Sequence, residues 1–283
     1  MSTVTLRRRA KQPEANLVGM THNPLGPRNP VNQNTTHNLF PEQEAFLETL
    51  EKTPPNALTA CALWRAHELV AHLTAGAVEI SLNLEAALNS LPIPATRSFL
   101  EREAPYREMA DQRLRNELLA SLERVSRALH AVLVKDPDAV VPWSGRSMVV
   151  ATFVNHLRSE LALHRWDLQG DDETGNVLLS QPELTAHAVT VLGKLLVDQT
   201  AEWTGAVGPL IVGTPDAPSV VVSQDSNGRQ MLFGDDNLDP TIVADAGARL
   251  LLLWGRMPND PRRVSAPGDP SPLAELRALL SGY

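Results

Sequence analysis

The sequence predicts an α+β protein in which an N-terminal four-helix bundle is followed by a smaller C-terminal α/β domain. Between about residues 41 and 169, apolar side chains recur three or four positions apart, which is the spacing of one face of an α-helix. After Gly170-Asp171-Asp172 the pattern changes to short β-prone runs separated by turn residues. With 283 residues, 43% of them hydrophobic, the chain can bury a core in each of two domains.

Four helices are expected in the first domain. The first is short and ends before Pro54, because proline lacks the backbone donor that the next turn needs. The second covers residues 66–89 and the third residues 106–134, each with an apolar stripe. The fourth begins with Ser147 as N-cap and ends at Gly170. Such helices pack as a bundle, and bundles hold their functional sites between facing helices.

The C-terminal domain is predicted from shorter signals. A helix is expected over residues 182–203. Two strands, residues 219–223 and 229–233, flank Asn227-Gly228, a dipeptide typical of tight hairpins. The remaining elements follow in order: a strand over 241–244, a helix over 247–255, a strand over 262–265 and a helix over 273–280. This mixture favours an α+β domain packed beside the helical one.

Charge marks a separate N-terminal segment. The first 38 residues contain five Arg or Lys and one acidic residue, a net charge of +4, which leaves −12 for the rest of a chain whose total is −8. The segment has no apolar periodicity, so it cannot offset the entropy of ordering it. We therefore expect residues 1–38 to form a disordered arm, residues 39–170 the helical bundle and residues 171–283 the α+β domain.

Composition argues against several classes of protein. A net charge of −8 repels nucleic acid and anionic membranes. No apolar run reaches the ~20 residues that span a bilayer, and the N-terminus lacks the apolar centre of a signal peptide. The single cysteine, Cys61, can form neither an internal disulfide nor a zinc site with several thiolates. We expect a cytoplasmic protein that binds neither nucleic acid nor membranes.

One helical segment carries most of the predicted chemistry. Glu160 and His164 are four residues apart and therefore lie one turn apart on the same helix face, and His156 extends that row by another turn. Leu157 and Leu161 border the face, so it is expected to point into the bundle. Burying even a neutral polar group without a partner costs ~2–7 kcal/mol. A bound metal ion would remove that cost.

A further ligand must come from a neighbouring helix. His72 is the best candidate, because it lies at the edge of the second helix's apolar stripe. Two His and one Glu form a known catalytic zinc set, although nickel, iron and cobalt accept the same donors, and Asp167 is placed to orient a ligand. Taken alone, the Glu-x3-His pair is also typical of a surface pair and His72 of an interior histidine. His67, His130 and His187 are expected to have structural roles.

Three segments resemble one known family. Residues 61–73, CALWRAHELVAHL, resemble the signature C-P-G-W-x-x-x-D-L-V-x-H-L of mycothiol-dependent maleylpyruvate isomerases, members of the DinB-like metal-binding superfamily. Residues 160–167, ELALHRWD, resemble the family segment E-x-x-x-H-x-W-D. Residues 252–256, LLWGR, and 267–269, PGD, are similar to elements of the family's small α/β C-terminal domain. The resemblance covers about residues 41–283.

The resemblance implies a DinB-like four-helix bundle in which His72, Glu160 and His164 bind a divalent metal, usually zinc. It also implies mycothiol as the thiol cosubstrate and Arg256 as the residue that binds a substrate carboxylate. The chain departs from the family pattern at three positions of the first signature, and the arm of 38 residues is an addition.

Together these observations predict a metal-dependent, mycothiol-dependent thiol transferase or isomerase that acts on a small, carboxylate-bearing electrophile. A metal lowers the pKa of a bound thiol and so creates a nucleophile near neutral pH. Arg256 and His156 are the expected catalytic residues. Two alternatives stay open: a metal-dependent hydrolase that uses bound water, with His156 or Glu79 as general base, and a noncatalytic metal- or ligand-binding module.

Overall fold

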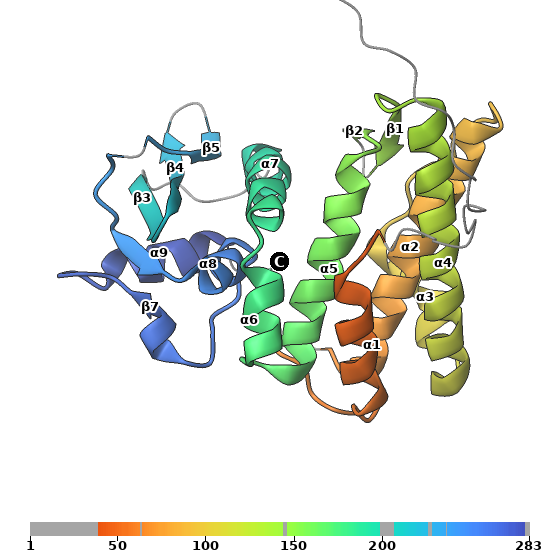
Figure 1. The fold of residues 1–283 in the computed structure, drawn as a ribbon, viewed down its shortest axis with the longest axis horizontal. Helices are drawn as coiled ribbons and strands as arrows, with labels where there is room; N and C mark the ends of the chain where they lie inside the picture. Colours follow the sequence, from red (N-terminus) through yellow and green to blue (C-terminus); the bar gives the residue numbers. More distant parts are fainter. Residues whose placement is uncertain are drawn as a thin grey trace, which may run out of the picture. The chain divides into compact units, whose positions relative to one another are not determined.

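The computed structural model describes residues 39–62, 64–143, 146–198, 207–225, 228–235 and 237–280. The predicted arm, residues 1–38, lies outside these ranges, as do the end of the helix predicted over 182–203 and Asn227 of the predicted turn. Within the described ranges the predicted α+β class is confirmed, with helices first and a mixed helix and sheet region after them (Figure 1). No helix in this part is long and apolar enough to cross a membrane.

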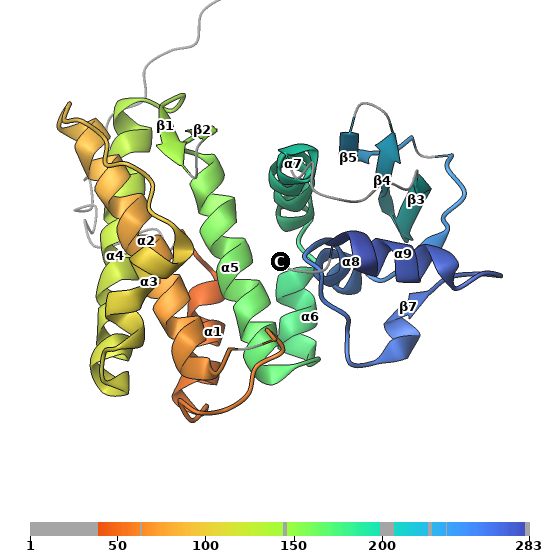
Figure 2. The same cartoon turned by 180° about the vertical axis from the view of Figure 1, so that it is seen from behind.

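The N-terminal region is mainly helical. Its elements are α1 (Glu42–Glu51), α2 (Ala66–Leu88), α3 (Phe99–Arg107), α4 (Asp111–Lys135), the hairpin strands β1 (Val140–Trp143) and β2 (Arg146–Val149), and α5 (Thr152–Gln169). Helix α2 packs along α4 and against α3, and α1 packs against α5; Figure 2 shows the same helices from behind. The predicted apolar stripes of α2 and α4 are buried, as illustrated by Leu69 and Leu84 in α2 and Leu118 and Leu129 in α4.

The single helix predicted over residues 106–134 is wrong at its start. Tyr106 belongs to α3, and residues 108–110 separate this helix from α4. Helix α3 begins at a capping box, in which the Ser98 hydroxyl accepts from the backbone N–H of Glu101 and the Glu101 carboxylate accepts from the backbone N–H of Ser98. This start signal is local and polar, so apolar periodicity does not reveal it.

The predicted start of the fourth helix is also wrong. Ser147 lies in β2, opposite Pro142 of β1, and does not cap a helix. Helix α5 begins only at Thr152. The valines around this segment favour extended backbone, and pairing with β1 satisfies that preference. The predicted end is confirmed, because Gly170 terminates α5 with a φ of 78°, a conformation that suits glycine.

The C-terminal region combines helices with a mixed sheet. Its helices are α6 (Glu173–Leu179), α7 (Pro182–Asp198), α8 (Ala246–Leu253), the short 3-10 helix η1 (Pro261–Arg263) and α9 (Ser271–Leu280). Its strands are β3 (Val207–Thr214), β4 (Ala217–Asp225), β5 (Gly228–Phe233), β6 (Ile242–Ala244) and β7 (Val264–Ser265), in the spatial order β5-β4-β3-β6-β7. Strands β3 and β6 are parallel, and the other neighbours are antiparallel.

Most C-terminal elements agree with prediction, but α6 and β3 were not predicted. The strand predicted over 262–265 is wrong at its start, because Arg262 and Arg263 belong to η1 and only Val264–Ser265 form β7. Helix α6 has only 7 residues, too few to show a helical period. Strand β3 begins with Val207, Gly208 and Pro209, and the last two residues are typical of a loop. Its pairing with β4 and β6 outweighs this local preference.

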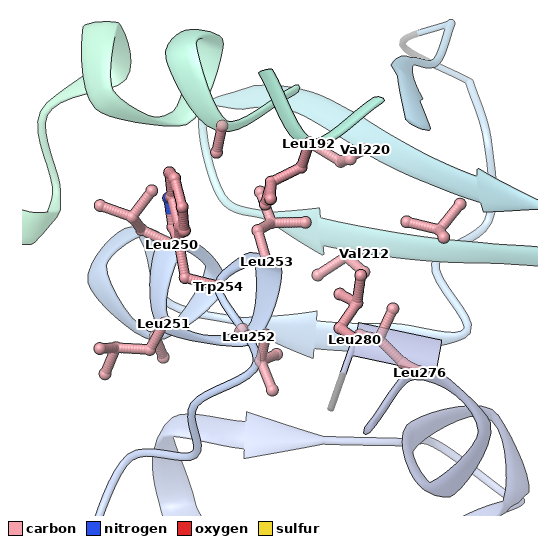
Figure 3. Close-up of a cluster of buried hydrophobic side chains, with 14 of the residues drawn as sticks. Leu192, Val212, Val220, Leu250, Leu251, Leu252, Leu253, Trp254, Leu276 and Leu280 are labelled. Carbon is pink, nitrogen blue, oxygen red and sulfur yellow. The ribbon is translucent and has the colours of Figure 1, made fainter. Parts of the chain in front are cut away.

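Helix α5 contributes to both apolar cores of the described chain. Phe153 and Leu157 belong to the core of the helical region, whereas Leu163 and Trp166 belong to the C-terminal core. Figure 3 shows part of the C-terminal core, where the leucines of α8 meet side chains from the sheet and α9. Because apolar contacts hold α5 on two sides, its polar side chains have a rigid support.

Candidate metal centre

The three ligands predicted from sequence meet between α2 and α5. Nε2 of His72 lies 3.3 Å from Oε2 of Glu160, and Nε2 of His164 lies 3.3 Å from the same oxygen. The two imidazole rings are 5.4 Å apart, edge to face. One ligand atom from each of the three residues lies within 4.8 Å of the others. The fold thus brings together residues separated by 88 positions in the chain.

Each histidine uses its other ring nitrogen to contact a buried carboxylate. Nδ1 of His72 is 2.7 Å from Oε1 of Glu103, and Nδ1 of His164 is 2.8 Å from Oδ2 of Asp167. A carboxylate on Nδ1 fixes the ring orientation and leaves Nε2 available for a metal. Both histidines therefore have the outer carboxylate partner that is characteristic of metal ligands, and both turn Nε2 toward Glu160.

Arg256 reaches the site from the C-terminal region and binds Asp167. Its Nε donates to Oδ1 of Asp167 at 2.8 Å, and its Nη2 donates to Oδ2 at 2.7 Å. Nη1 donates to the backbone carbonyl of Trp254 at 3.0 Å, and Nη2 also lies 3.5 Å from Sγ of Cys61. In this arrangement the guanidinium orients the carboxylate behind His164. The catalytic role expected for Arg256 stays a prediction.

The charges of the site favour a cation. Burial alone would raise the pKa of Glu160, but hydrogen bonds with His164 and His72 lower it well below its usual range. Burial alone would raise the pKa of Asp167 too, but hydrogen bonds from Arg256 and His164 lower it. Burial alone would lower the pKa of His164. Its hydrogen bonds, of which the one with Asp167 has the largest effect, raise this pKa well above the usual value. The ionised carboxylates stabilise positive charge here, whether a proton or a metal ion.

The donor set of His72, Glu160 and His164 fits a divalent metal. Two imidazole nitrogens and one carboxylate oxygen are the ligands of catalytic zinc sites that keep a fourth position open. A second group of potential donors, Cys61, His164 and Asp167, shares His164 with the first. Asp167 already holds a guanidinium and an imidazole in that group. The first group, which we call the metal triad, is therefore the better candidate.

The two residues considered as general bases, His156 and Glu79, differ in their hydrogen-bond partners. His156 is one turn before Glu160 on α5, and its Nδ1 is buried with no hydrogen-bond partner among the described residues. Glu79 is buried and accepts hydrogen bonds from the backbone N–H and the guanidinium of Arg97, at 3.2 and 3.3 Å. The fold places His156 beside the metal triad and pairs Glu79 with an arginine.

Sequence reasoning missed Glu103 and His187. Glu103 lies on α3, a helix that was not predicted, although Arg107 four residues later forms a recognisable helical ion pair with it. His187, for which a structural role was expected, has its ring centroid 5.5 Å from that of His156. No feature of the sequence near His187 indicates this proximity, because it arises from the packing of α7 on α5.

Comparison with known proteins indicates the family that the sequence motifs resemble. Residues 39–169 match the family described as "Mycothiol maleylpyruvate isomerase N-terminal domain". Similar solved structures are the mycothiol-dependent maleylpyruvate isomerase, at 14% identity, and a histidine-to-alanine mutant of it, at 13%. Each matches with a TM-score of 0.55 over 76% of this chain and 85% of that chain. No curated protein sequence matches at a significant level. At such identities the structural likeness shows a shared fold.

Proposed function

We propose that this chain, whose residues 39–169 belong to the mycothiol maleylpyruvate isomerase N-terminal domain family, is a cytoplasmic, metal-dependent enzyme that uses mycothiol as cosubstrate. Its substrate is a small, carboxylate-bearing electrophile, and its reaction is isomerisation or transfer of the thiol. The observation that carries the proposal is the convergence of His72, Glu160 and His164, with a carboxylate behind each imidazole.

The donors support zinc as the metal. A zinc ion held by the triad would lower the pKa of a bound thiol and so supply a nucleophile near neutral pH. The side chains around the triad support this chemistry because they fix the orientation of the ligands. Glu103 and Asp167 orient the two imidazoles, and the Trp64 ring, 4.8 Å from the His72 ring and 6.1 Å from the His164 ring, shields them on one side.

The reaction depends on the electrophile. In isomerisation, the thiolate forms a C–S bond to one carbon of a conjugated cis double bond, the resulting single bond rotates, and the same C–S bond breaks as the double bond reforms. No atom is gained or lost. In transfer, the C–S bond persists and the neighbouring carbon takes up a proton. Both reactions need a carbonyl or carboxylate in conjugation with the double bond.

The proposal is tested by measuring metal content and activity together. His72→Ala removes one ligand, and His130→Ala, at an exposed position of α4, is the matched control. We expect the unmodified protein and His130→Ala to purify with equimolar metal and, when mycothiol is present, to convert maleylpyruvate to its trans isomer or to its mycothiol adduct, as followed by chromatography. His72→Ala should lose both properties. Full activity in metal-free protein would overturn the proposal.

A further inference from the structure

A second group of metal-binding side chains meets at the other ring nitrogen of His164. Nδ1 of His164 lies 2.8 Å from Oδ2 of Asp167, and Sγ of Cys61 lies 3.1 Å from the same oxygen. One ligand atom from each of these three residues lies within 4.8 Å of the others. The metal triad instead uses Nε2 of His164, which lies 3.3 Å from Oε2 of Glu160. The two nitrogens of one imidazole therefore face two different groups of donors.

The backbone holds Cys61 against the end of α5. The backbone N–H of Ala60 donates to the carbonyl oxygen of Asp167 at 2.8 Å, and the backbone N–H of Cys61 donates to Oγ1 of Thr59 at 3.2 Å. Neither hydrogen bond uses the thiol. His164 and Asp167 are three residues apart on α5, so one helix positions both side chains. Main-chain contacts thus bring the sulfur to the two α5 side chains, and a change of the thiol alone should leave the segment in place.

A positive charge already lies at this group. Nη2 of Arg256 is 2.7 Å from Oδ2 of Asp167 and 3.5 Å from Sγ of Cys61. The guanidinium therefore occupies the place from which a cation contacts the carboxylate and the sulfur together. This observation is independent of the donor chemistry, and it shows that the folded protein accommodates a cation at these atoms.

A divalent ion can replace the guanidinium with the charges in balance. In the structure the negative charge of Asp167 is matched by the positive charge of Arg256, and Cys61 donates its S–H to Asp167. When a divalent ion binds, the S–H bond breaks, its proton goes to solvent, and the thiolate and the carboxylate together neutralise the ion. The guanidinium carries its charge into solvent, and no atom is oxidised or reduced. Arg256 lies in the loop after α8 and Cys61 is half-buried, so solvent reaches the site.

Binding of an ion at Nδ1 withdraws His164 from the metal triad. A neutral imidazole carries one proton, so only one of its two nitrogens is free to bind a metal. The contact of Nδ1 with Asp167 keeps the proton on Nδ1 and leaves Nε2 for the triad. When Nδ1 binds an ion, the proton moves to Nε2, which then no longer binds a metal. The two groups of donors therefore compete for His164.

The donors select a thiol-binding cation. Thiolate, imidazole and carboxylate all bind zinc, and a thiolate favours such ions over magnesium and calcium, which prefer oxygen ligands. We propose that Cys61, Asp167 and Nδ1 of His164 form a second, inhibitory site for a divalent, thiol-binding cation, which we call the Cys61 site. Binding of this ion is independent of the proposed function. The inhibition rests on that function, because the ion takes His164 from the triad.

Cadmium is a suitable probe of the Cys61 site, because thiolate-bound Cd²⁺ absorbs in the ultraviolet by charge transfer. Cys61 is the only cysteine of the chain, so this absorption in the full-length protein reports one residue. The control is the double variant Cys61→Ser with His130→Cys, which carries its thiol at an exposed position of α4. We expect Cys61 to bind Cd²⁺ at least about tenfold more tightly than the control thiol, because two further ligands contribute. Equal affinities would overturn the inference.

Two further variants distinguish the Cys61 site from the metal triad. Asp167→Asn replaces a ligand of the Cys61 site, and we expect the dissociation constant of thiolate-bound Cd²⁺ to rise about tenfold or more. Glu103→Gln removes the carboxylate that contacts Nδ1 of His72, and it should not weaken this binding. Cadmium-113 NMR of the unmodified protein needs no variant, and its resonance should show coupling to ¹⁵N-labelled histidine. Unchanged affinity in Asp167→Asn, or a resonance without that coupling, contradicts the proposed ligand set.

The inhibition is measured with zinc. We expect conversion of maleylpyruvate in the presence of mycothiol to fall as Zn²⁺ exceeds an equimolar amount, and to fall less in Cys61→Ser. Serine retains an O–H donor for Asp167, so both proteins should bind the first equivalent of zinc alike. Equal inhibition of the two proteins would remove the inhibitory role. Tight thiolate binding of Cd²⁺ in a protein that does not convert maleylpyruvate would overturn the proposed function and leave the Cys61 site standing.

Discussion

The metal triad and the neighbouring pair of His156 on α5 and His187 on α7 differ in how their polar atoms are paired. At the triad, Nδ1 of each histidine contacts a buried carboxylate, and each of those carboxylates binds an arginine. In this pair, Nδ1 of His156 and Nε2 of His187 have no hydrogen-bond partner within the described ranges. The carboxylates on both triad histidines fix the orientation of their rings, whereas no hydrogen bond at these two nitrogens orients the rings of His156 and His187.

The largest effect is expected from removing a triad histidine. His164→Ala deletes a ligand and also takes one partner away from buried Asp167. We expect metal affinity to fall by more than ~100-fold, beyond the range for loss of an outer partner, and activity to disappear with it. Metal titration by competition with a chromophoric chelator measures this. If His164→Ala retains metal like the unmodified protein, the triad does not hold the metal.

Removing an outer carboxylate should have the next largest effect. Asp167→Asn keeps the shape of the side chain but removes the charge that faces His164 and Arg256. We expect metal affinity to fall ~10–100-fold and the free energy of unfolding to fall by ~3–5 kcal/mol, because a buried guanidinium loses its counter-charge. Glu85→Gln, which disrupts the half-exposed pair with Arg124, is the control and should leave metal affinity unchanged.

A smaller effect is expected at the arginine behind that carboxylate. Arg256→Lys keeps the charge but lacks the planar fork that donates twice to Asp167. We expect metal affinity to fall by about tenfold at most while KM for the electrophile stays constant, because the residue positions Asp167. Steady-state kinetics at saturating metal test this. A raised KM with constant metal affinity would instead support the carboxylate-binding role that the family resemblance implies.

The burial of the unpaired His187 imidazole can be probed through the pH dependence of the free energy of unfolding. The pKa of His187 is about 3 in the folded protein, against ~6.5 in the unfolded chain. The unfolded chain therefore binds the proton more strongly, so the contribution of neutral His187 is complete above pH ~6.5 and is lost as the pH falls toward ~3. The slope reaches at most ~1.4 kcal/mol per pH unit. Urea unfolding at several pH values should show that the free energy of unfolding depends less on pH in His187→Phe than in the unmodified protein. In His130→Phe the dependence should be unchanged.

The smallest effect is expected from deleting residues 1–38. Every residue of the metal triad and of its outer carboxylate partners lies beyond position 60. We therefore expect metal content and melting temperature to stay nearly constant. A large loss of stability in the shortened protein would show that the arm contacts the rest of the chain.

Sequence alone was sufficient for features that depend on neighbouring positions. Apolar spacing defined α2 within a residue of its observed ends, and the four-residue spacing of Glu160 and His164 placed them on one helix face. The signature around His72 suggested the partner helix. Each of these inferences uses a repeat or a motif in which the informative residues lie within a few helical turns of one another.

Tertiary structure decided what joins distant segments. Glu103 reaches His72 only because α3 packs on α2, Arg256 reaches Asp167 across 89 positions, and His187 reaches His156 because α7 packs on α5. Strand β3 formed despite its glycine and proline because two neighbours pair with it. Helical and strand periods are local properties of the chain, whereas hydrogen-bond pairing of buried side chains depends on which elements pack together, and a single sequence does not display that packing.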